Sequence, residues 1–258
     1  MIEHATLKAP GRTIGYRFGG SGPLIVLIAS TGRAGSDFME LAEGLIERGF
    51  QVALPDPRGI GESDGRLEGI GFYDLADDVA HIIAAHAERG FVAGHAYGAW
   101  IARTVAQAHP ERVAGLALLA AGAGKWPGHL SGAIDILCNP ETSRDDKLAA
   151  LRMAFFAPGN DPEDWLSGWH GPVMTAQRAA RENTDDAWKR SGTAPILDLL
   201  ALQDPFRPPQ SYTFYKQTLG ERVSVQTIDK ASHALPHERP EAVAEALAVW
   251  IETLRPRS

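Results

Sequence analysis

The chain of 258 residues has the length of one domain, and its 44% apolar and 22% charged residues exclude a disordered or fibrous protein. Its 25 basic and 32 acidic side chains give a net charge of −7. The composition therefore does not indicate the basic surface with which proteins bind nucleic acid or an anionic membrane. The single cysteine, Cys138, excludes an internal disulfide and a zinc cluster.

The N-terminus and the apolar runs predict a cytoplasmic protein. A secretory signal has basic residues followed by an apolar run, and the N-terminal residues do not show this pattern. The longest apolar stretch, residues 24–29, is far shorter than the roughly 20 residues that span a bilayer. We therefore expect a small-molecule substrate, and neither nucleic acid nor a membrane as a partner. The sequence does not indicate an oligomeric state.

Short apolar runs that alternate with helical patterns predict an α/β fold. The predicted strands are an edge hairpin of 6–7 and 13–18, then 24–29, 50–54, 91–93, 113–120, 196–202 and 223–228. The predicted helices are 36–48 (capped by Ser36), 73–87, 97–108 and 240–254. Continuous apolar runs are typical of strands buried on both faces, and the alternation indicates a mostly parallel central sheet flanked by helices.

Residues 123–195 contain no convincing strand and predict a helical cap, inserted in a core made of residues 1–122 and 196–258. One helix is expected to begin near Ser143 and another after Pro162. Most aromatic side chains of this segment are expected to pack the cap on the core. Some are expected to line an apolar pocket, for which the candidates are Trp126, Met153, Phe156, Trp165 and Trp169.

A short strand at 91–93 runs through Gly94-His95-Ala96-Tyr97-Gly98 directly into a helix. This segment resembles the nucleophile elbow, Gly-x-Ser-x-Gly, of the α/β-hydrolase superfamily. Residues 55–63 resemble the D-x-R-G-x-G-x-S loop of the same proteins. Asp204 stands at the family's acid position and His233 at its histidine position, in the order that the fold uses. The resemblance covers residues 12–255.

The resemblance implies a site in which the residue at position 96 attacks a carbonyl carbon. His233 would remove the proton of that residue, and Asp204 would orient the imidazole. The N–H of Tyr97 and a second N–H near Gly32 would hold the oxyanion. The resemblance implies no metal and no organic cofactor. Asp56 and Arg58 are expected to be structural, bonding the loop backbone and each other.

The chain departs from the family pattern at the nucleophile itself, because position 96 is alanine and a methyl group can neither attack nor give up a proton. Three interpretations stay open. The chain could be a nucleophile-deficient variant of a parent with serine. Alanine could be natural, with His233 and Asp204 acting by general-base chemistry. The chain could also be a binding protein that turns nothing over.

A second departure is Ser30-Thr31-Gly32, where family members usually carry His-Gly. Ser30 and Thr31 lie near the expected oxyanion site, so they are candidate replacement nucleophiles. Their alternative role is to satisfy backbone groups. Three further residues are expected to be structural: Asp37 at a helix N-terminus, and His95 and Cys138 as packed side chains.

The predicted reaction follows from the residue at position 96. With a serine parent we expect hydrolysis of a small, largely apolar ester, lactone or amide. With a natural alanine we expect general-base chemistry. A haloalkane dehalogenase or an epoxide hydrolase is disfavoured, because both need an aspartate at this position.

Overall fold

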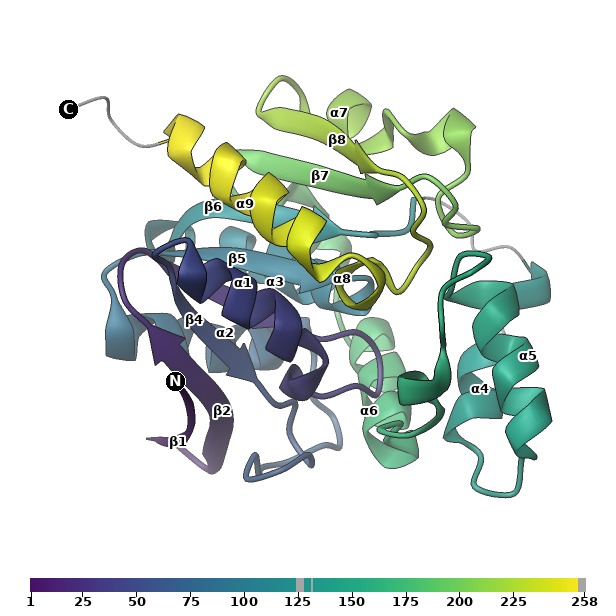
Figure 1. Ribbon diagram of the computed structural model, residues 1–258. Helices are drawn as coiled ribbons and strands as arrows, with labels where there is room; N and C mark the ends of the chain where they lie inside the picture. Colours follow the sequence, from purple (N-terminus) through teal and green to yellow (C-terminus); the bar gives the residue numbers. More distant parts are fainter. Residues whose placement is uncertain (124–127, 131, 255–258) are drawn as a thin grey trace.

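The computed structural model describes residues 1–123, 128–130 and 132–254, and within them an eight-stranded sheet has the order β1-β2-β4-β3-β5-β6-β7-β8 (Figure 1). The strands are β1 (Ile2–Ala9), β2 (Arg12–Gly20), β3 (Leu24–Ile28), β4 (Gln51–Pro55), β5 (Gly90–His95), β6 (Val113–Leu119), β7 (Ile196–Ala201) and β8 (Val223–Ile228). The β1–β2 and β2–β4 pairs are antiparallel, and the other pairs are parallel. The predicted mostly parallel sheet with an edge hairpin is therefore confirmed.

Helices cover both faces of this sheet, because its central strands are apolar on both sides. On one face α1 (Met39–Glu47) packs beside α9 (Pro240–Leu254) (Figure 1). On the other face lie α2 (Phe72–His86) and α3 (Tyr97–Ala108). The helix predicted to begin at Ser36 instead starts as a 3₁₀ turn, Gly35–Phe38, whose first N–H, that of Gly35, donates to Asp56 Oδ1 rather than to a capping Ser36.

Between β6 and β7 the described residues form helices and 3₁₀ turns and no strand. The elements are a turn at Gly128–Leu130, α4 (Ala133–Cys138), α5 (Arg144–Ala154), a turn at Glu163–Leu166, α6 (Gly171–Glu182) and a turn at Asp186–Arg190. Ser143 Oγ accepts the N–H of Asp146, so the predicted helix start is confirmed. The prediction of a single helix after Pro162 is wrong, because the chain forms a 3₁₀ turn at Glu163–Leu166 and a separate helix, α6. Gly168 has a φ of 77°, which an α-helix does not allow, so α6 begins only after it.

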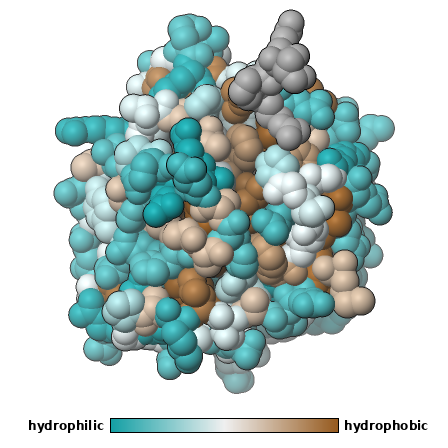
Figure 2. Space-filling view, turned by 90° about the vertical axis from the view of Figure 1, so that its left-hand side faces the viewer, coloured by the Kyte–Doolittle hydropathy of each residue, from teal (hydrophilic) through white to brown (hydrophobic). Residues whose placement is uncertain are grey.

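The remaining helices, α7 (Phe214–Leu219) and α8 (Leu235–Glu238), flank β8, and short 3₁₀ turns lie at Pro110–Arg112 and Pro209–Ser211. No helix within the described ranges combines the length and the apolar character that crossing a bilayer requires. On the face shown in Figure 2, hydrophilic residues surround scattered apolar ones.

Two glycines allow the end of β5, the start of α3 and the end of β3 to meet. A Cβ on Gly94 would lie 2.2 Å from the backbone oxygen of Gly98, and a Cβ on Gly98 would lie 2.2 Å from the backbone oxygen of Ile28. Between them Ala96 has a φ of 50° and a ψ of −108°. Such a conformation costs about 1–3 kcal/mol in a residue other than glycine, so the packing around it must hold it in place.

Replacing Gly98 tests this close packing. Gly98→Ala forces α3 away from β3, so we expect the free energy of unfolding, measured by urea titration, to fall by about 3 kcal/mol. The matched control is Gly132→Ala, because a Cβ there meets nothing within 4 Å and the φ of Gly132 is −88°. Equal losses in the two variants would contradict the packing argument.

Candidate active site

The structure brings together His233 and Asp204, which the sequence predicts to act as a pair. Asp204 follows the end of β7, and His233 lies between β8 and α8. The Nδ1–H of His233 donates to Asp204 Oδ2 over 2.9 Å, and both side chains are buried. Asp204 Oδ1 accepts the backbone N–H of Phe206 over 2.8 Å. The pair therefore fixes the tautomer of His233, and its Nε2 bonds to none of the described residues.

A second histidine supports the loop that carries His233. The Nε2–H of His95 donates to the backbone carbonyl of His233 over 2.6 Å. Burial, and then the charge of His233, lower the pKa of His95 to about 3, so His95 is neutral and this donor is always present. The expectation that His95 is a packed histidine with a satisfied hydrogen bond is confirmed.

His95 also gives the stability of the fold a pH dependence. Because its pKa is lowered to about 3 from the ordinary 6.5, the unfolded chain binds the proton more tightly. The stabilising contribution is complete above about pH 6.5 and is lost as the pH falls from there toward 3, by up to about 1.4 kcal/mol per unit. His95→Gln keeps an N–H donor but binds no proton. We expect its urea midpoint to fall less than the parent's between about pH 7 and pH 5, and parallel losses would argue against this role.

The loop after β3 lies against the first turn of α3. A Cβ on Gly98 would come within 2.2–2.6 Å of the backbone oxygens of Ile28 and Ala29, so Ser30 follows directly beside the elbow. Within the described residues, the backbone N–H groups of Ser30, Thr31 and Tyr97 donate no hydrogen bond. They are the donors available to an oxyanion at this point.

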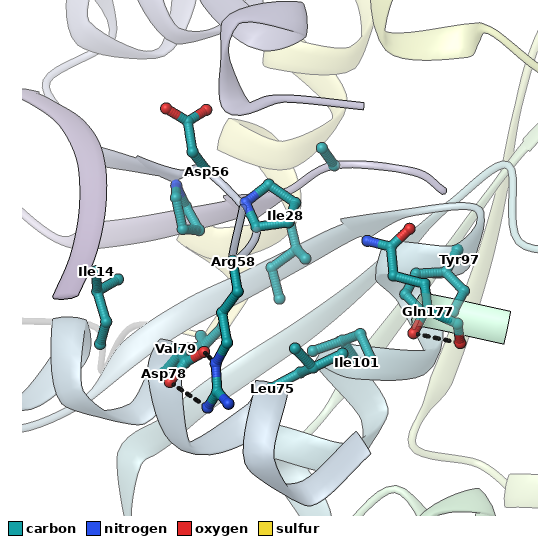
Figure 3. A pocket seen from close by; sticks show the side chains of 13 residues that line it. Ile14, Ile28, Asp56, Arg58, Leu75, Asp78, Val79, Tyr97, Ile101 and Gln177 are labelled. Atoms are coloured by element: carbon teal, nitrogen blue, oxygen red, sulfur yellow. Dashed lines mark hydrogen bonds and ion pairs between the residues drawn. The ribbon is translucent and has the colours of Figure 1, made fainter. Parts of the chain in front are cut away.

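Gly32, the residue around which the second oxyanion donor is expected, has its own N–H engaged. That N–H donates to Oε1 of Gln177 on α6 over 2.8 Å. The hydroxyl of Tyr97 donates to the backbone carbonyl of Gln177 over 3.1 Å (Figure 3), and burial raises the pKa of this hydroxyl. Gln177 on α6 therefore bonds both to the loop after β3 and to the side chain of Tyr97. Sequence reasoning missed it, because no motif links residues 145 positions apart.

Arg33 attaches the insertion to the loop after β3. Its guanidinium carbon lies 4.6 Å from the ring centroid of Trp165 and 4.7 Å from that of Trp169, and the two rings contact each other edge to face at 5.7 Å. Its Nε and Nη2 donate to the two carboxylate oxygens of Asp37, and its Nη1 donates to the carbonyl of Ser167. Asp37, expected to stabilise a helix terminus, is thus the counter-charge of a buried arginine. Cation–π and bidentate contacts of this kind are strong when desolvated.

The expected pocket residues of the cap have different outcomes, and of them Trp165 lies beside the elbow, with its ring centroid 6.2 Å from that of His95. Trp126 lies outside the described residues. Met153 is 46% exposed, so its prediction as a pocket residue is wrong. It stands about 200° around α5 from the buried Leu151 and so faces outward. Phe156 and Trp165 are buried in an apolar cluster that joins this segment to Phe206 and Ala234 of the core, and Trp169 packs against that cluster.

A cavity of about 290 Å³ does open beside the elbow, lined by Thr31 and Tyr97 together with Trp100, Ile134 and residues of α6. Trp100 comes from the second turn of α3, a position that the sequence offered only as part of a helix. The apolar wall next to the candidate site is therefore built by α3 and α4. The aromatic residues of the predicted cap pocket do not build it.

Tyr97 and Gln177 also line a small cavity of about 50 Å³, together with residues of α2 and of the loop after β4 (Figure 3). Arg58 reaches its edge and binds both carboxylate oxygens of Asp78, over 2.7 and 3.0 Å. Asp56 accepts the backbone N–H of Gly35 and pairs with Arg17. The structural roles expected for Asp56 and Arg58 are confirmed, but their ionic partners are Arg17 and Asp78 rather than each other.

Residues 25–246 match the model of a family described as the alpha/beta hydrolase family. The chain belongs to this family. The match includes the elbow, Asp204 and His233, and it agrees with the sheet order and with the place of the elbow between β5 and α3.

Relatives within this family differ in the reactions that their names state. Epoxide hydrolase B of Mycobacterium tuberculosis is 34% identical over 98 residues, which are 37% of this chain and 28% of that protein. Pyrethroid hydrolase of Sphingobium wenxiniae is 26% identical over 243 residues, 87% of this chain and 86% of that one. A solved esterase from Thermogutta terrifontis covers 98% of this chain and all of its own, at 20% identity and a TM-score of 0.79. The chain spans less than half the length of the first curated relatives that it matches.

Proposed function

We propose that the chain hydrolyses a small, largely apolar ester, lactone or amide, with His233 and Asp204 as a general-base pair and without a covalent enzyme intermediate. The observation that carries the proposal is the buried hydrogen bond of 2.9 Å between these two side chains. A protein that only binds its ligand needs no oriented imidazole. The alanine at position 96 leaves that imidazole no side-chain hydroxyl to deprotonate there.

The reaction follows from the positions of the polar groups. The substrate carbonyl oxygen accepts the N–H groups of Tyr97 and Ser30. His233 Nε2 takes a proton from water while the water oxygen bonds to the carbonyl carbon, and Asp204 stabilises the imidazolium that forms. The tetrahedral intermediate then breaks its bond to the leaving oxygen or nitrogen. That atom takes the proton back from Nε2, so the enzyme returns to its starting state.

The cavity beside the elbow supports the substrate class. Its volume of about 290 Å³ suits a small molecule, and Tyr97, Trp100 and Ile134 give it apolar walls. The names of two relatives state hydrolysis of an epoxide and of a pyrethroid. Ester hydrolysis, unlike epoxide hydrolysis in this fold, needs no carboxylate at position 96.

The general-base role is tested with p-nitrophenyl acetate. We expect His233→Ala to lower kcat/KM by about a hundredfold or more, because positioned proton transfer contributes that much. His81→Ala on the exposed side of α2 is the control and keeps the parent rate. Equal rates for the parent and the His233→Ala variant, with both folded by circular dichroism, would overturn the proposal.

The backbone at Ala96 favours a second candidate, a serine hydrolase in which this residue is replaced. A φ of 50° in a residue other than glycine is a strained conformation that is typical of functional positions, and here it occurs at the position of the elbow nucleophile. The same Tyr97 and Ser30 donors would serve an acyl-enzyme. The parent would then differ from this chain by one hydroxyl group.

Ala96→Ser tests whether the site is competent for covalent catalysis. We expect a burst of p-nitrophenol equivalent to the enzyme concentration, because His233 can deprotonate the new hydroxyl and the acyl-enzyme then accumulates. Adding His233→Ala to this variant is the control and removes the burst. A folded Ala96→Ser chain without a burst would show that the oxyanion donors are wrongly placed.

A further inference from the structure

A third cavity, of about 400 Å³, lies between α3, α7 and the 3₁₀ turn Asp186–Arg190. Its walls combine aromatic rings with cationic side chains. The rings come from Trp100, Trp188, Phe214 and Tyr215, and the cationic groups come from Arg103, Arg181 and Lys189. None of these residues carries the chemistry proposed above.

Arg103 is the buried cation of this cavity, with 6% of its surface exposed. Its Nε donates to Ser191 Oγ over 2.7 Å, and its Nη2 donates to the Lys189 carbonyl over 2.5 Å. Within the described part of the chain, no carboxylate lies within 4 Å of it. Burial lowers its pKa, and the nearby Tyr215 and Asp198 offset only part of that effect. A desolvated cation with no carboxylate in direct contact is unfavourable, and an anion in the cavity would reduce that penalty.

The other two cations share a single carboxylate. Arg181 and Lys189 each lie 2.9 Å from Oδ1 of Asp186. The wall therefore holds three cations against one carboxylate, in a chain whose net charge is −7. This local excess of positive charge opposes the balance of the whole molecule and selects for an anionic ligand.

The aromatic part of the wall defines the rest of the ligand. The Arg103 guanidinium lies over the Trp188 ring at 4.8 Å, and Trp188 packs against Trp100 at 5.9 Å between centroids. The indole N–H of Trp188 is buried, with no hydrogen-bond partner among the described residues. A flat apolar ligand can stack here while an acceptor atom of its acidic group meets the basic side chains.

We propose that this cavity binds an aromatic carboxylate, with its acidic group on Arg103, Arg181 and Lys189 and its ring among Trp100, Trp188 and Phe214. The site is separate from the His233–Asp204 pair, and binding does not depend on the proposed hydrolysis. Trp100 and Arg181 also line the cavity beside the elbow, so a ligand bound here touches the wall of the proposed substrate pocket.

The test is a calorimetric titration of the full chain with 2-naphthoate and with its uncharged analogue 2-naphthamide. We expect the naphthoate to bind at least about tenfold more tightly than the amide, and this difference to shrink with added salt. Arg181→Gln should weaken naphthoate binding by about tenfold and leave the amide unchanged. Asp186→Asn should instead tighten naphthoate binding, which damage to the fold would not do.

Lys216→Gln on α7 is the matched control, since this exposed lysine pairs with Glu221 and is not one of the residues that line the cavity. It should bind naphthoate as the parent does. Equal affinities for the carboxylate and the amide would overturn the proposal. So would weaker naphthoate binding by a folded Asp186→Asn variant, or no binding of naphthoate at all.

Discussion

The structure depends on the close approach of α3 to the ends of β3 and β5. Gly94 and Gly98 permit it, and Ala96 is strained by it. This one packing constraint fixes the direction of the first turn of α3. It thereby sets the Tyr97 N–H beside the loop that begins at Ser30. The candidate site is thus a consequence of backbone packing, which explains why it survives intact around an alanine.

The polar half of the site is held by groups that are themselves buried and bonded. Asp204 accepts hydrogen bonds from the backbone N–H of Phe206 and from His233. His95 in turn donates a hydrogen bond to the backbone carbonyl of His233. From the segment between β6 and β7, Gln177 bonds to Gly32 and Tyr97, and the rings of Trp165 and Trp169 pack against Arg33. Proton transfer within such an arrangement needs little reorganisation, which is the condition for efficient general-base catalysis.

The fold was largely predictable because its information is local. Glycine spacing marked the elbow, apolar runs marked the strands, and motif order marked Asp204 and His233. The pocket was not predictable, because it is made by contacts between distant segments. Helical periodicity alone could have excluded Met153, which lies opposite the buried stripe of α5, but nothing local distinguishes Trp100 as a wall or Gln177 as a clamp. The partner of Asp37 was missed for a related reason. Its arginine is only four residues away, yet that pairing is secured by Trp165 and Trp169 from the insertion.

The central claim is that His233 and Asp204 act without a covalent intermediate on this chain. Intact-mass spectrometry during turnover of an aryl acetate tests it most directly. We predict that product accumulates while every enzyme molecule keeps its unmodified mass. An acetyl adduct that forms and decays at the rate of turnover, on Ser30, Thr31 or any other side chain, would contradict it.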